Sequence, residues 1–257
     1  LIDVNELAKD YDYYQVSGIS ISPDNKKMAF GVDTLSRRIY TIKVKDLGTG
    51  KMYPDKIHGV NSYTTWASDS KTMFYTGKDE QTLRSDKIFR HTLGESQDDD
   101  TLVYEEKDET FSTYVYPSKS REYIMIGSTS TMATEYRFLS SKTPLESFKV
   151  LQKRERGLEY SPSHVGDMFY ISTNIDESTN FKLVKTPITS TEKSNWRDVI
   201  PHREDVLIED TDFFNDFMVI GERSNGLLKI RIKSWDGKED YYLNLSSQFD
   251  FENDTYS

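Results

Sequence analysis

A hairpin pattern recurs along this chain at intervals of roughly 45–50 residues, a period typical of β-propellers. Each copy has an apolar, β-branched run, then a turn rich in Ser, Asp, Asn and Lys, then a second apolar run. The clearest copy covers residues 19–30, with its turn at 22–26. Four further copies follow at residues 64–75, 113–126, 158–171 and, more weakly, 212–220. Alternation bounded by turn residues predicts a β-hairpin in each.

Each hairpin is followed by further strand-like runs. A third run lies at residues 39–44, 87–90, 136–139, 181–184 and 228–232. A fourth run lies at residues 101–104, 148–151, 205–208 and 240–243. Four antiparallel strands per unit make a propeller blade. We therefore expect an all-β chain built from four-stranded antiparallel blades.

About five such units fit the chain, which stops at residues 248–257, where a sixth would begin. We expect a lead-in segment over residues 1–14, with a short helix at 4–9, and a partial propeller over 15–257. Blades bury their flat faces against neighbours, so an array needs closure or capping. A closed five-bladed ring is one interpretation. A truncated larger ring is favoured, because the last segment resembles an interrupted unit.

The amino-acid composition argues against several classes of function, namely nucleic-acid binding, membrane spanning and cysteine chemistry. The 17 Tyr and 13 Phe residues favour strands, and the formal charge of −10 comes with acids and bases interspersed. No basic stripe of the kind that binds nucleic acid occurs, and no apolar run approaches the length of a membrane span. The absence of cysteine excludes disulfides and a Cys nucleophile, and it fits a cytoplasmic location, although a periplasmic one stays open.

Motifs for catalysis or metal binding are missing. The string at residues 18–22 has Ser20 two residues after Gly18 but lacks the second glycine of a nucleophile elbow. The four histidines, at positions 58, 91, 164 and 202, show no ligand spacing, and we expect surface or packing roles for them. Residues 98–100, three aspartates, are expected to form a solvated loop. We predict no catalytic residue, no metal and no cofactor in this chain.

Several strings resemble the N-terminal propeller of the oligopeptidase B (protease II) branch of the prolyl oligopeptidase family of serine peptidases. The two most specific are Arg-His-Thr-Leu-Gly at residues 90–94 and Glu-Glu-Lys-Asp-Glu-Thr-Phe at residues 105–111. Supporting strings lie at residues 11–15, 37–40, 45–47, 82–84, 103–104, 118–121, 128–130, 135–137, 200–203, 222–223 and 226–227. The resemblance extends from about residue 11 to about residue 230.

The resemblance implies a parent enzyme that cleaves short peptides after Arg or Lys. Its Ser, Asp and His triad would lie on a C-terminal α/β-hydrolase domain outside this chain, and the family propeller would have seven blades. The implied partners are that peptidase domain and short basic peptides. The implied role of the propeller is gating, because a ring of blades over an active site admits only short or unfolded peptides.

Blade topology predicts which loops meet a peptidase domain. The loops between second and third strands, at residues 33–38, 78–86, 128–135, 174–180 and 223–227, should share one end of the blades with connections such as 105–111. The candidate contacts with the peptidase domain or substrate cavity are Arg37, Arg38, Arg84, Glu105, Glu106, Glu135 and Arg223. The competing interpretation is that these residues brace the loops within the propeller. The charged run at residues 105–109 likewise has two interpretations, a solvated connection between blades or an electrostatic contact with another domain.

Two other function classes stay open. A stand-alone binding scaffold of the WD-repeat kind is one, although the Trp-Asp dipeptide occurs only at Trp235-Asp236, in a predicted turn. An extracytoplasmic propeller module is the other, since such modules also use Ser-Pro-Asp turns.

Overall fold

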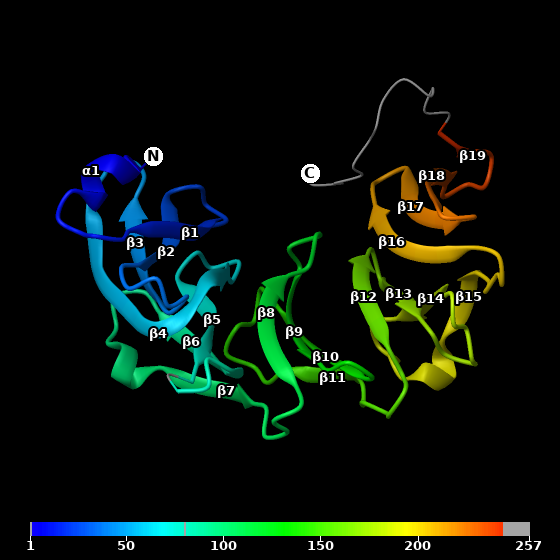
Figure 1. Ribbon diagram of the computed structural model, residues 1–257, viewed down its shortest axis with the longest axis horizontal. Coiled ribbons are helices and arrows are strands. Elements are labelled where there is room, and N and C mark those ends of the chain that lie inside the picture. The colour runs from blue at the N-terminus through cyan, green and yellow to red at the C-terminus, as the bar shows by residue number, and fades with distance from the viewer. Residues whose placement is uncertain (1, 80, 244–257) are drawn as a thin grey trace. The chain divides into compact units, whose positions relative to one another are not determined.

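The computed structural model describes residues 2–79 and 81–243, and nearly all regular structure in it is β-strand (Figure 1). One short helix, α1 (Val4–Ala8), lies in the lead-in segment, where a helix over 4–9 was expected. Asp3 caps it, because its carboxylate accepts a hydrogen bond from the Glu6 amide at 3.2 Å. The chain forms two compact units, Leu1–Arg154 and Glu155–Ser257.

The first unit begins with a seven-stranded antiparallel sheet in chain order. Its strands are β1 (Gln15–Ile21), β2 (Lys27–Asp33), β3 (Tyr40–Asp46), β4 (Met52–Trp66), β5 (Thr72–Lys78), β6 (Ser85–Thr92) and β7 (Thr101–Glu105), with the short helix η1 (Gln97–Asp99) before β7. The 15-residue β4 belongs to two blades: its first part pairs with β3, and its last part pairs with β5. The register shifts between Val60 and Thr64, where one blade passes into the next. The sequence pattern showed no separate fourth strand for the first predicted blade, because that strand continues directly into the first strand of the second blade.

The third blade completes the first unit. It is a four-stranded sheet of β8 (Ser112–Pro117), β9 (Tyr123–Thr129), β10 (Thr134–Ser140) and β11 (Lys149–Gln152). All its neighbouring strands pair antiparallel. This sheet confirms the third four-stranded blade predicted from the sequence.

The second unit contains two further four-stranded sheets. The first has β12 (Tyr160–Val165), β13 (Met168–Thr173), β14 (Lys182–Pro187) and β15 (Arg197–Ile200), with η2 (Lys193–Asn195) before β15. The second has β16 (Leu207–Phe213), β17 (Phe217–Ser224), β18 (Leu227–Ser234) and β19 (Asp240–Tyr242). The five predicted blades are therefore all present. Residues 248–257, where a sixth unit would begin, lie outside the described residues.

One predicted strand was assigned to the wrong blade. Residues 205–208 were expected to close the fourth unit, but β15 closes it and Leu207 begins β16 of the fifth. The error has a physical cause. Arg197 and Asp198 are exposed on an outer strand, so β15 shows no apolar alternation, while the apolar residues that follow it already face the next blade.

Hydrophobic cores lie between blades. Phe74 and Ile88 of the second blade pack with Ile124 and Ile126 of the third. In the second unit, Leu183 and Ile200 of the fourth blade pack in one cluster with Ile208, Met218 and Ile220 of the fifth. A twisted four-stranded sheet cannot bury its own faces, so apolar burial stabilises these blades only through stacking.

The loops between second and third strands lie where the first strand starts. Pairings place Gln15 beside Asp33, Ser112 beside Thr129, Tyr160 beside Thr173 and Leu207 beside Arg223. We call this end of each blade the loop end. Within each unit, the loops and the connections between blades therefore share an end, as predicted.

Candidate functional site

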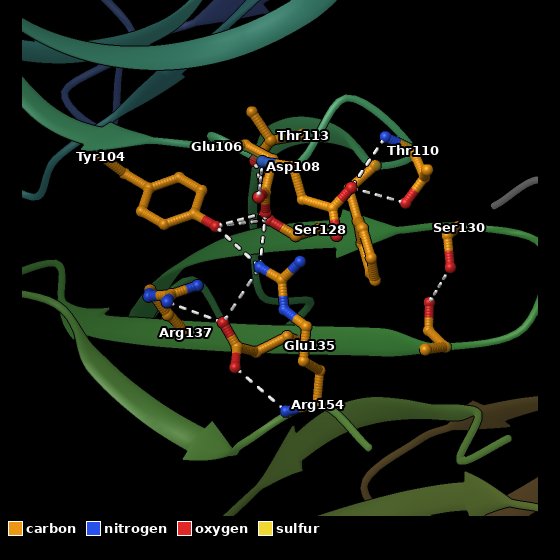
Figure 2. Close-up of polar contacts among 12 residues, drawn as sticks. Tyr104, Glu106, Asp108, Thr110, Thr113, Ser128, Ser130, Glu135, Arg137 and Arg154 are labelled. Atoms are coloured by element: carbon orange, nitrogen blue, oxygen red, sulfur yellow. Dashed lines mark hydrogen bonds and ion pairs between the residues drawn. The ribbon is translucent and has the colours of Figure 1, made fainter. Parts of the chain in front are cut away.

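Arg154 is the centre of a partly buried ionic network at the loop end of the first unit (Figure 2). It follows β11, while Glu106 begins the connection after β7 and Glu135 lies in β10. Its Nη2 is 2.5 Å from Oε2 of Glu106 and 3.5 Å from Oε1 of Glu135. Its backbone amide also donates to Oε2 of Glu135 at 3.0 Å. The network thus joins two interblade connections to a central strand.

Aromatic rings and hydroxyls enclose these charges. The Tyr104 hydroxyl donates to Oε2 of Glu106 at 2.6 Å, and Ser128 Oγ donates to the Tyr104 oxygen at 3.0 Å (Figure 2). The Arg154 guanidinium lies 4.0 Å from the Phe111 ring centre, and the Arg137 guanidinium lies 4.1 Å from that of Tyr104. Both distances suit cation–π attraction.

The network holds fixed charges. Burial raises the pKa of Glu106, but hydrogen bonds from Arg154 and Tyr104 outweigh burial and hold that pKa below its usual value. Burial lowers the pKa of Arg154, and its bond to Glu106 more than reverses the effect. Both groups are therefore ionised at neutral pH. Such an arrangement positions backbone and does not transfer protons.

Arg84 fixes the backbone of the connection over residues 106–111. Its Nε donates to the carbonyl of Phe111 at 3.0 Å, and its Nη2 donates to the carbonyls of Glu106 and Asp108 at 2.8 and 2.6 Å. The Asp108 carboxylate in turn accepts bonds from the amide and hydroxyl of Thr110. The sequence left open whether residues 105–109 form a solvated connection or an electrostatic contact with another domain. In the structure, the guanidinium of Arg84, from the second blade, holds the backbone that follows Glu105.

A similar network of a glutamate, a tyrosine and an arginine occurs in the second unit. Glu222, 1% exposed, is bonded by Arg203 and accepts a 2.6 Å hydrogen bond from the Tyr242 hydroxyl. Arg203 lies in the connection between β15 and β16, as Arg154 lies after β11. Asn180, in the loop before β14, donates through Nδ2 to the carbonyls of Arg203 and Glu204. Each unit therefore has a buried glutamate joined to a tyrosine and to a connection arginine.

The seven predicted site residues fall into groups. Arg84, Glu106 and Glu135 come together at the loop end of the first unit and brace it. Arg223 pairs with Glu209 in the second unit, at 2.5 Å. The other three predicted residues, Arg37, Arg38 and Glu105, have exposed side chains. Bracing is thus observed for four residues, and contact of any of the seven with a peptidase domain stays a prediction.

Sequence reasoning missed Arg154, Arg137, Arg203 and Tyr104. Arg154 lies in a charged run, Lys-Arg-Glu-Arg at 153–156, which is the counterpart of the run at 105–109 one blade later. That equivalence between connections was a usable signal. The burial of Glu106, however, depends on strands that the sequence does not place beside it.

A second buried ionic cluster joins the first and second blades. His91 is 2.7 Å from Asp100 through Nδ1 and 3.1 Å from Asp55 through Nε2, and all three side chains are almost inaccessible. The Tyr75 hydroxyl donates to Asp100 at 2.7 Å. The prediction of a solvated loop at 98–100 is therefore wrong for Asp100, although Asp98 and Asp99 are exposed. Asp100 is buried because its carboxylate pairs with a histidine from the neighbouring strand.

The described residues contain neither a metal-binding cluster nor a membrane-spanning helix. No group of three or more His, Cys, Asp or Glu side chains among residues 2–79 and 81–243 could hold a metal ion. No helix within those ranges is long and apolar enough to cross a membrane.

Known proteins resemble this chain over nearly its whole length. It is 40% identical over 241 residues to dipeptidyl aminopeptidase BI of Pseudoxanthomonas mexicana and 31% identical over 232 residues to protease 2 of Moraxella lacunata. These matches cover 94% and 90% of the chain, which spans about a third of the length of each relative. The structure of oligopeptidase B from Leishmania major superposes with a TM-score of 0.89 at 28% identity, over 96% of this chain and 36% of that one.

The structure of oligopeptidase B from Trypanosoma brucei superposes with a TM-score of 0.83 at 26% identity, over 94% of this chain and 34% of that one. The family model described as prolyl oligopeptidase, N-terminal beta-propeller domain, matches residues 1–256. This chain belongs to the prolyl oligopeptidase family and forms its N-terminal β-propeller domain.

Proposed function

We propose that this chain is the non-catalytic, substrate-selecting propeller of a serine oligopeptidase that cleaves short peptides after Arg or Lys. The observation that carries the proposal is the family match over residues 1–256, together with relatives named protease 2 and oligopeptidase B. The loop-end networks support it, because a domain that admits or rejects substrates by size needs connections that keep their shape. The net charge of −10 also favours basic peptides over acidic ones.

The first test asks whether the 257-residue chain has peptidase activity without a peptidase domain. The 257-residue chain has no nucleophile elbow and should give only background turnover of a short, Arg-containing fluorogenic peptide. A longer protein that includes a C-terminal peptidase domain should cleave that peptide and leave a folded protein with the same cleavage site intact. Stoichiometric labelling of the 257-residue chain by a serine-reactive phosphonate would contradict the proposal.

The second test probes the loop end as the surface that meets the peptidase domain. Glu105 is exposed at the end of β7, so Glu105→Lys changes a surface charge without disturbing the Arg154 network. Glu146→Lys is the matched control, because Glu146 is exposed in the loop between β10 and β11, at the opposite end of the same unit. In the longer protein, Glu105→Lys should alter peptide turnover at low salt and Glu146→Lys should not. Equal turnover by both variants would place the contact elsewhere.

A second candidate function comes from the relative with 40% identity, which is named a dipeptidyl aminopeptidase. A parent enzyme of that kind would release dipeptides from a free amino terminus. Mass spectrometry of the products from a peptide with a free amino terminus and from its acetylated form separates the two candidates. Internal cleavage after Arg or Lys in both peptides supports the first, and dipeptide release that acetylation abolishes supports the second.

A further inference from the structure

A pocket of about 470 Å³ lies in the first unit, outside the Arg154 network. The last part of β4, at residues 61–65, and strand β8 form most of its wall, and these two strands contact each other. Tyrosine rings from both strands line it, at positions 63, 114 and 116. Tyr63 is 66% exposed, so a large aromatic surface faces solvent at this pocket.

Two cations belong to the same pocket. Arg38 comes from the loop after β2, and Lys78 ends β5. Lys78 Nζ donates to the carbonyl oxygen of Arg38 at 2.8 Å, which keeps the ammonium beside the arginine residue. Within residues 2–79 and 81–243, neither side chain forms an ion pair. Burial lowers the pKa of Lys78 and repulsion from Arg38 lowers it further, while attraction to the Asp33 carboxylate partly opposes both effects.

The loop that carries Arg38 is held in place. The buried Asp33 carboxylate accepts hydrogen bonds from the amides of Leu35 and Arg38, both at 2.8 Å. Arg38 itself has a φ of 55°, a left-handed conformation that costs a residue with a side chain free energy. Since strain of this kind persists only where the surroundings enforce it, the position of Arg38 is built into the loop.

A buried threonine with an unbonded hydroxyl lies beside the pocket. Thr64 is 6% exposed, and its Oγ1 has no hydrogen-bond partner in the described structure. Buried hydroxyls are normally bonded. The Thr64 Oγ1 is itself inaccessible, so the groups that a ligand can reach are the two cations and the tyrosine wall. This set suits an anion attached to an apolar or aromatic side chain.

We propose that this pocket binds the carboxylate of a peptide, with Arg38 and Lys78 holding the anion and the tyrosines packing on the neighbouring side chain. The choice of a peptide as ligand rests on the proposed function, and the carboxylate rests on the two cations. The anion relieves the repulsion between Arg38 and Lys78 and gains charge-assisted hydrogen bonds. The pocket gives an acidic protein a local attraction for the carboxylate of a peptide that is otherwise basic.

Binding to the 257-residue chain tests the pocket without any need for turnover. Three probes are used: acetyl-Ala-Phe as the free acid, acetyl-Ala-Phe amide, and acetyl-Asp-Phe amide. In amide NMR spectra the free acid should shift pocket residues at millimolar concentration and bind about tenfold more tightly than acetyl-Ala-Phe amide, and more weakly at high salt. Tight binding of acetyl-Asp-Phe amide would show that a side-chain carboxylate serves as well as the terminal one. Equal binding of the acid and its uncharged amide, or no binding of any probe, overturns the proposal.

Adjacent arginines provide the matched control. Arg37 is exposed in the same loop but does not line the pocket. Arg38→Gln should weaken binding of the free acid about fivefold, while Arg37→Gln, with the same change of net charge, should not. Equal weakening by both variants would reduce the effect to general electrostatics and refute the site. Tyr63→Ala removes an exposed ring at little cost to folding and should also weaken binding.

The outcome is independent of the peptidase proposal. If the 257-residue chain binds the free acid but the longer protein fails to cleave peptides, the pocket stands and the proposed function fails. If the longer protein cleaves peptides but the chain shows no difference between acid and amide, the pocket fails alone.

Discussion

At the scale of single residues, a close approach of two backbone segments in the first unit explains a glycine. Gly18 in β1 has a φ of 65°, and a Cβ placed on it would lie 2.1 Å from the carbonyl oxygen of Ser62 in β4. Gly50 shares a positive φ, of 73°, but has open space around it. The two positions therefore separate the effect of backbone conformation from that of steric fit.

We expect Gly18→Ala to destabilise the protein by about 3 kcal/mol or more, because the strand must move away from β4. Gly50→Ala should cost only the left-handed conformation, about 1 kcal/mol. Urea unfolding followed by circular dichroism measures both. A Gly18→Ala variant no less stable than Gly50→Ala would show that β1 and β4 pack more loosely than described.

His91 makes stability depend on pH. Burial lowers its pKa, but hydrogen bonds to Asp100 and Asp55 outweigh burial, and the folded-state pKa lies above the usual value. The imidazolium therefore contributes stability that is fully present below the unfolded-state pKa and is lost as pH rises through the folded-state pKa. We expect the free energy of unfolding to fall across that window in wild type and not in His91→Gln. His58→Gln, at an exposed histidine, should keep the wild-type pH dependence.

At the scale of elements, the interblade connections are fixed by arginines. Arg154→Gln removes the cation beside Glu106, which is 4% exposed, and leaves a buried carboxylate without its charge partner. We expect a loss of about 2–3 kcal/mol, below the cost for a fully buried pair because Arg154 is partly exposed.

Arg156→Gln is the control for this change, since Arg156 is exposed in the same connection. Its effect on thermal unfolding should be within about 0.5 kcal/mol. If the two variants unfold alike, the Arg154 network contributes nothing measurable to stability. Hydrogen exchange of the amides at 106–111 should also accelerate in Arg154→Gln and not in Arg156→Gln, because this connection depends on Glu106.

At the scale of the whole molecule, stability resides between blades. Phe74 is fully buried in a cluster that includes Val115, Ile124 and Ile126 of the next blade. Phe74→Ala should cost about 3–5 kcal/mol by opening a cavity in that shared core. Hydrogen exchange measured by mass spectrometry should quicken in β8–β10 as well as in β5. Leu102→Ala, at a residue 45% exposed on β7, should change exchange little in either blade, and a Phe74→Ala effect confined to β5 would contradict shared cores.

The hairpin repeat and the turn chemistry determined most of the fold. Alternation of apolar residues with a period of two is a local property, so five hairpins, their third strands and the loop end followed from the chain itself. Local signals failed where one strand serves two blades, as β4 does, and where an outer strand such as β15 is too polar to alternate.

The candidate sites depended on tertiary structure. Sequence placed Arg84, Glu106 and Glu135 at one end of the blades, but their partner Arg154 lies 48 residues beyond Glu106. Lys78 and Arg38 belong to different blades and meet only because those blades stack. The pattern of side chains along each strand is set by the sequence. Which charges are buried, paired or left without a partner is decided by the packing of blades, because the energy of a charge depends on the neighbours and the solvent that the assembled fold gives it.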